Sequence, residues 1–167
     1  MSYSSAFAIF FATVQNKLHW AIHGHTAAEL IKERADSQSP NMGLTNWSGG
    51  AITKKDVSIA KNYLTQEELD NLNRVVTMYL DYAENQARRK QAMTMQQWAD
   101  KLDAFLAFNE HDVLANAGKI SQKIAKQLAE VEYDKFVEQR RITNDSIPSD
   151  FDQFLEQSAQ LIKPKQE

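Results

Sequence analysis

Apolar residues recur at steps of three and four along most of the chain, the spacing that gathers side chains on one face of an α-helix. The pattern is strongest between Thr65 and Lys90, where Thr65 and Glu68 have the spacing of a helix-capping box. It predicts a central amphipathic helix of roughly 37 Å. Other helices have to cover its apolar face, because a helix of this length is rarely stable alone. The residues of that face are Leu69, Leu72, Val76, Tyr79, Leu80, Ala83 and Ala87.

The same spacing predicts helices on both sides of the central one. The first of these has a predicted buried face of Phe7, Phe10, Phe11, Val14, Leu18 and Ile22. No stretch shows the alternation of apolar and polar residues that is typical of a strand. The expected fold class is therefore all-α, a single-domain bundle of six to eight helices with one long ordered loop. The ranges expected to be helical are 5–22, 26–36, 53–64, 65–90, 94–109, 121–141 and 150–162, with one further turn over 113–117.

The long loop is expected between Ser37 and Ile52. Loops of this length are uncommon in compact domains and are then usually functional or disordered. Three apolar residues, Met42, Leu44 and Trp47, indicate an ordered loop that lies across the bundle, with Trp47 as its most buried anchor. The helical domain as a whole is expected to cover residues 1–143, and a linker, a short helix and a tail are expected over 144–167.

Composition excludes some functions. The chain has 167 residues, no Cys and a net charge of −3, so disulfides and Cys-based zinc sites are impossible. The negative charge also argues against a free-standing, non-specific nucleic-acid binder. No apolar run approaches the ~18 residues of a membrane-spanning helix. The short run from Ala6 to Ala12 lacks the basic residues that precede a signal sequence, so a cytoplasmic protein is expected.

Histidines are crowded at the end of the first predicted helix. His19 and His23 lie one turn apart, a spacing that allows two imidazoles to bind one metal ion. No His-Glu-x-x-His motif is present, and one packed, hydrogen-bonded histidine with two exposed ones is the favoured interpretation. His19 and His23 are therefore weak metal candidates only, and no cofactor is expected.

Charged and polar residues flank the long loop on both sides. In one interpretation, Arg34, Lys61 and Asn62 bind a phosphate or another substrate group, while Glu29 or Asp36 acts as a base or metal ligand. In the alternative, these residues lie on solvated helix faces and form local pairs. The sequence contains no phosphate-binding loop and no nucleophile elbow.

Eight short segments, taken together and in order, resemble the RhuM-type virulence proteins of bacteria. No segment alone is specific, but their order covers most of the chain from about residue 10 to residue 136. The segments are Gln15–His19, Gly24–Glu29, Glu33–Asp36, Asn41–Thr45, Ala60–Leu64, Tyr79–Glu84, Met93–Met95 and Ala117–Ser121.

The resemblance implies a role rather than a reaction. Proteins of this family usually carry an N-terminal half that looks like a winged-helix or phage-antirepressor DNA-binding module, and travel with pathogenicity islands and mobile elements. The chain is therefore expected to be a C-terminal helical interaction or effector domain that mediates self-association or partner binding. Nucleic acid would bind through the absent N-terminal module, and no membrane is expected. The alternative is an enzyme that acts on a nucleotide or nucleic-acid phosphate through the charged cluster beside the 37–52 loop.

Overall fold

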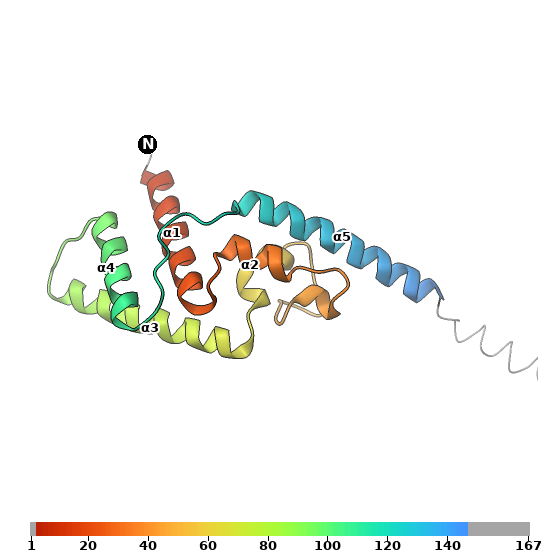
Figure 1. Cartoon of the computed structure of the whole chain (residues 1–167), viewed down its shortest axis with the longest axis horizontal. Helices are drawn as coiled ribbons and strands as arrows, with labels where there is room; N and C mark the ends of the chain where they lie inside the picture. Colours follow the sequence, from red (N-terminus) through yellow and green to blue (C-terminus); the bar gives the residue numbers. More distant parts are fainter. Residues whose placement is uncertain (1–2, 147–167) are drawn as a thin grey trace, which may run out of the picture.

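The computed structural model describes residues 3–146, which form five α-helices and three short 3-10 helices (Figure 1). No strand occurs within residues 3–146, so the predicted all-α class is confirmed. Five α-helices are fewer than the six to eight expected, and the helix expected over 150–162 lies outside the described residues. The elements are α1 (Tyr3–His23), α2 (Ala27–Arg34), η1 (Pro40–Gly43), η2 (Asp56–Ser58), η3 (Ala60–Tyr63), α3 (Gln66–Arg88), α4 (Met95–Phe108) and α5 (Gln122–Ser146).

Helix starts follow the capping pattern of the sequence. Thr65 and Glu68 form a complete capping box at the start of α3, in which each side chain binds the backbone N–H of the other residue. The pairs Thr26–Glu29 and Thr94–Gln97 do the same for α2 and α4. Each box satisfies backbone donors that a helix start otherwise leaves unpaired. All three predicted helix starts are confirmed.

The range 53–64 is not one helix but the two 3-10 turns η2 and η3. Ile59 separates them in an extended conformation, with φ −106° and ψ 108°. Two side chains donate hydrogen bonds to backbone carbonyls of η2. The Tyr63 hydroxyl donates to Val57 O (2.7 Å), and the Asn62 amide donates to Asp56 O (2.9 Å). Such side-chain bonds compete with helix formation. The turn expected over 113–117 is also not helical, whereas α5 continues to Ser146, into the range where a linker was expected.

Two apolar clusters hold the helices together. The first joins α2, the long loop, the 3-10 turns, the start of α3 and the inner face of α5. The second lies where α1, α3 and α4 meet, around Val75, Leu102 and Leu106. Val75, which is only 3% exposed, was not on the face predicted for the central helix. The fully buried side chains of the first cluster include Leu30, Ile31, Met42, Val57, Ala125 and Ala129.

The long loop is ordered, but its main anchor is Met42 rather than Trp47. Met42 is fully buried and Leu44 is 5% exposed, whereas Trp47 only packs against the edge of the first cluster. The chain reverses sharply at Asn41 and Met42, whose φ angles of 53° and 57° are left-handed. This reversal directs Met42 inward, and Asp36 N–H closes the turn by donating to Met42 O (3.3 Å). The prediction that Trp47 is the most buried anchor was therefore wrong.

Candidate functional site

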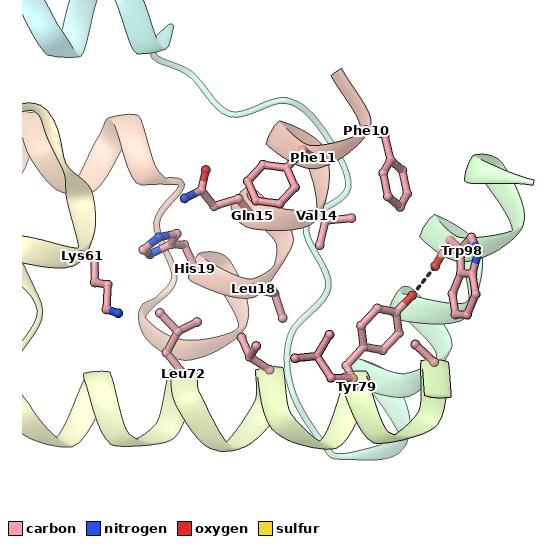
Figure 2. Close-up of a pocket in the computed structure, with 13 residues that line it drawn as sticks. Phe10, Phe11, Val14, Gln15, Leu18, His19, Lys61, Leu72, Tyr79 and Trp98 are labelled. Carbon is pink, nitrogen blue, oxygen red and sulfur yellow. Dashed lines mark hydrogen bonds between the residues drawn. The ribbon is translucent and has the colours of Figure 1, made fainter. Parts of the chain in front are cut away.

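An apolar groove of about 460 Å³ lies between α1 and α3, with Trp98 of α4 at one end (Figure 2). α1 lies at a steep angle to α3 (Figure 1), and the groove lies between the side chains of the two helices. The apolar lining consists of Phe10, Phe11, Val14 and Leu18 from α1, and Leu72, Val76, Tyr79, Leu80 and Ala83 from α3.

The rim of the groove exposes large apolar side chains. Phe11 is 58% exposed and Leu80 is 60% exposed, although the sequence pattern predicted both to face inward. Their spacing fits a buried face, but more than half of each side chain is exposed to solvent. An uncovered apolar surface with such a pattern is typical of a binding site.

Polar contacts fix the helices that form the groove. Lys17 of α1 binds the carboxylate of Asp103 of α4 at 2.7 and 2.9 Å. The Tyr79 hydroxyl of α3 donates to Trp98 O of α4 at 2.7 Å, and the two rings meet edge to face at 6.3 Å (Figure 2). These bonds join all three helices, so the groove is a preformed feature of the fold.

The opposite end of the groove is polar. Gln15, His19 and Lys61 point toward this end from α1 and η3 (Figure 2). Lys61 is exposed, and its ammonium group makes no hydrogen bond or ion pair with the residues that the structure describes. The groove therefore combines a long apolar floor with one free ammonium group.

The histidines bind one another. His19 is 2% exposed, and its Nδ1 lies 3.0 Å from Nε2 of His23. Burial lowers the pKa of His19 to about 4, and burial followed by the nearby His19 ring lowers that of His23 to about 4, so both rings are neutral near pH 7. The third ring, His25, contacts Glu33 at 2.7 Å and His23 O at 2.9 Å.

The contact between the two rings bears on the weak metal candidates His19 and His23. The nitrogen atoms that His19 and His23 direct at each other are the ones that a shared metal ion would need. Within residues 3–146 no group of three His, Asp or Glu side chains is placed to hold a metal ion. His23 Nδ1 is buried and has no hydrogen-bond partner among the described residues.

Among the phosphate-binding candidates, Arg34 is occupied by protein groups. Its two terminal nitrogens bind the Glu68 carboxylate at 2.6 and 2.7 Å, and one of them also donates to Tyr63 O at 2.9 Å. The hydrogen bond from Arg34 is the largest cause that lowers the pKa of Glu68 to about 2. The sequence pattern gave no signal for this pair, because Glu68 was already assigned to the capping box of α3.

The other candidates lie in separate local networks. Glu29 completes the capping box of α2 and accepts a bond from Lys119 N–H at 2.7 Å. Asp36 accepts bonds from Ser39 Oγ (2.8 Å) and Gln38 N–H (2.9 Å). Asn62 bonds Asp56 O, as described above. No hydrogen bond or ion pair among the described residues joins any two of the five candidates Glu29, Arg34, Asp36, Lys61 and Asn62.

A buried carboxylate that the sequence analysis did not select organises the turn before η2. Asp56 is 3% exposed and accepts bonds from the Thr53 hydroxyl (2.6 Å), Thr53 N–H (2.9 Å) and the Ser48 hydroxyl (3.3 Å). The bonds from Thr53, first that of its hydroxyl, lower the pKa of Asp56. Its place three residues after Thr53 is the only signal in the sequence, and it indicates a turn rather than a catalytic group.

Comparisons with known proteins show the family to which the chain belongs. Among the described residues, no helix is long and apolar enough to cross a membrane. Comparison with curated proteins and with solved structures gives no match. The model of one protein family, described as the virulence protein RhuM family, matches residues 2–144, which is most of the chain. The chain therefore belongs to the RhuM family of virulence proteins.

Proposed function

We propose that this RhuM domain is a protein-interaction module whose groove between α1 and α3 binds an amphipathic helix of a partner protein. The observation that carries the proposal is the preformed apolar groove with exposed Phe11 and Leu80 on its rim. Docking of an amphipathic helix into a groove between two helices is a recurrent mode of peptide recognition. Membership of a virulence-associated family is compatible with such a role and does not require a reaction.

The dimensions of the groove favour a macromolecular partner over a small ligand. A volume of about 460 Å³ is within the range of small-molecule pockets, which usually bury most of their ligand. Here, however, the apolar surface continues outward onto Phe11 and Leu80, more than half of whose area is exposed. A small ligand on the floor of the groove leaves this rim uncovered, whereas a helix that spans the groove covers both.

The positive charge of Lys61 at the polar end of the groove indicates which charge the partner helix should carry there. Lys61 has no ion-pair partner within the described chain and lies at one end of the apolar floor. A carboxylate on the partner helix, next to its apolar face, would pair with this ammonium group. Such a rim pair contributes orientation and association rate more than affinity. We therefore propose a partner helix with an acidic residue at the end that lies beside Lys61.

The hydrogen bonds and ion pairs of the charged residues give less support to the enzyme alternative than the groove gives to the interaction module. For Arg34 to bind a phosphate, it would have to give up a two-pronged bond to Glu68 and leave that carboxylate unpaired, which is costly for partly buried groups. Glu29, Asp36 and Asn62 are held by bonds to backbone atoms of their own surroundings. Lys61 alone is free to contact a ligand, and it lies beside an apolar floor.

Site-specific photo-crosslinking in the cells from which the chain comes tests the proposal. A photoreactive residue at Leu80 lies on the groove rim, and one at Met78 lies on the same helix, exposed but outside the groove. We expect Leu80 and Phe11 to give the same crosslinked protein and Met78 to give none. The crosslinked peptide should be an amphipathic helix, and Leu80→Glu should abolish the product obtained from Phe11, whereas Met78→Glu should not.

Two outcomes would reject the module. One is an equal yield from Met78 and Leu80, which would mean that capture depends on exposure alone. The other is a crosslink from Leu80 to nucleic acid or to a nucleotide, which would support the enzyme alternative. Both glutamate variants replace exposed side chains, so the fold is expected to tolerate them, and circular dichroism checks this directly.

A further inference from the structure

We propose that α5 forms an antiparallel two-helix contact with α5 of a second copy of this chain. This surface is separate from the groove, so the inference does not depend on the partner proposed above. α5 spans 25 residues, roughly 37 Å, and continues past the rest of the described fold (Figure 1). Among the described residues, α2 and the 3-10 turns η1 and η2 pack against its inner face.

The uncovered face of α5 carries a second apolar stripe. Its inner face contains the fully buried Ala125 and Ala129. On the stripe, four apolar residues are 41–56% exposed, and two charged residues complete a regular alternation of four-residue and three-residue steps. Such a repeat is the seam of a coiled coil, in which each side chain inserts between four residues of the facing helix. The stripe consists of Ile124, Leu128, Val131, Lys135, Glu138 and Ile142.

The two charges disfavour a parallel arrangement. In a parallel pair each seam residue faces its own copy, so Lys135 would face Lys135 of the second copy and Glu138 would face Glu138. Like charges in direct opposition are destabilising. In an antiparallel pair with the symmetry axis between residues 136 and 137, Lys135 faces Glu138 of the second copy, and the two-fold axis creates this pair twice.

The same register matches the apolar residues. It places Val131 opposite Ile142 of the second copy, so that Ile142 inserts into a hole formed by Leu128, Val131, Glu132 and Lys135. A register that instead opposes Val131 to Lys135 puts Leu128 against Glu138, and so buries each charge against an apolar side chain. Of these two registers, the one with its axis between 136 and 137 therefore pairs the opposite charges with each other and Val131 with Ile142.

The ion pairs within α5 are compatible with this contact. Lys135 binds Glu132 at 2.6 Å, and Glu138 binds Arg141 at 2.8 Å. The Lys135 ammonium has three donors. Both Glu138 oxygens accept a bond from Arg141, but a carboxylate has about four lone-pair sites, so each group can add a bond across the interface. The result is an alternating network, Glu132–Lys135–Glu138–Arg141, which crosses from one copy to the other.

Disulfide trapping tests the orientation, because the chain has no Cys of its own. We expect an oxidised equimolar mixture of full-length Val131→Cys and Ile142→Cys chains to give mixed covalent dimers. Each variant alone should give few, because an antiparallel pair separates identical seam positions. Efficient dimers of either variant alone would indicate a parallel pair, and absence of all three products would overturn the proposal.

Sedimentation of the full chain over a micromolar concentration series tests the charges. Lys135→Glu should weaken the dimer about tenfold or more, and Lys135→Glu with Glu138→Lys should restore it to within about threefold. Ile142→Glu should also weaken it, whereas Val137→Glu, 45% exposed but off the stripe, is the matched control. A wild-type chain that stays monomeric, or equal effects of Ile142→Glu and Val137→Glu, would overturn the proposal. Leu80→Glu should leave dimerisation unchanged, which separates this surface from the groove.

Discussion

Arg34 and Glu68 form a two-pronged ion pair between α2 and the start of α3, with nitrogen–oxygen distances of 2.6 and 2.7 Å. The two side chains are 27% and 19% exposed. Arg34 also binds Tyr63 O, and Glu68 accepts a bond from Thr65 N–H. A single pair thus joins the end of α2, the end of η3 and the cap of α3, close to the buried histidines.

Arg34→Met is expected to lower the free energy of unfolding by about 2–3 kcal/mol, because it leaves a partly buried carboxylate without its cation. The exposed pair Glu84–Arg88 on α3 supplies the control, with side chains 62% and 78% exposed. Arg88→Met should cost below ~0.5 kcal/mol. Urea denaturation measures both. Equal midpoint shifts for the two variants would show that the first pair has no special structural role.

Local signals made the helices predictable from the sequence. Thr26, Thr65 and Thr94 each precede Glu or Gln by three residues, and each begins a helix. Such caps act within a few residues of chain, so their effect does not depend on the tertiary fold. The same holds for Gly24, whose φ of 73° ends α1 as expected from a glycine in that place.

Interactions between distant residues were not predictable in the same way. The apolar period identified a buried face for Phe11 and Leu80, but the packing of α1 against α3 decides which part of that face is covered. Likewise, the charges of Arg34 and Glu68 were visible in the sequence, but their 34-residue separation gave no reason to pair them. The groove and the ion pair both depend on packing between elements.

Gly43 is expected to tolerate no side chain. Its φ is +78°, and a Cβ placed on it would lie 2.2 Å from the backbone oxygen of Arg34, which cannot move without displacing the end of α2. Gly43→Ala should therefore lower the free energy of unfolding by at least ~3 kcal/mol, through the clash and the left-handed backbone together. Thermal and urea denaturation measure the change.

Gly49 is the matched control in the same loop. Its φ is +88°, but nothing lies within 4 Å of a Cβ placed there. Gly49→Ala should cost about 1 kcal/mol, which is the conformational penalty alone. If both variants lose the same stability, the close approach between Gly43 and α2 does not exist in solution.

Met42→Ala should destabilise the chain more than Trp47→Ala, although tryptophan is the larger residue. Met42 is fully buried, and the cavity left by its removal should cost about 3 kcal/mol. Trp47 packs at the edge of the cluster, so its replacement should cost about 1–2 kcal/mol. Limited proteolysis should show faster cleavage within residues 37–52 for Met42→Ala. The reverse order would make Trp47 the principal anchor, as the sequence pattern suggested.

The buried histidines should make the fold sensitive to mild acid. Their pKa values are about 4 in the folded chain, against 6.5 for an ordinary imidazole. Between these values the unfolded chain binds more protons, so the free energy of unfolding falls as the pH falls from about 6.5 toward 4. The expected slope is about 1.4 kcal/mol per pH unit for each proton taken up. Urea midpoints measured from pH 7 to pH 4.5 report this slope.

Two variants separate the histidines from the carboxylate beside them. His19→Gln removes one titrating ring, so its stability should depend less steeply on pH between 6.5 and 4.5. Glu68→Gln should lower the free energy of unfolding at pH 7, because the ion pair with Arg34 is lost. It should leave the dependence of that free energy on pH between 6.5 and 4.5 nearly unchanged. The Glu68 carboxyl has its pKa lowered to about 2, so its own contribution is fully present above about pH 4.5 and is lost as the pH falls toward 2. A wild-type chain equally stable at pH 7 and pH 5 would show that His19 and His23 are not held neutral by burial in the folded chain.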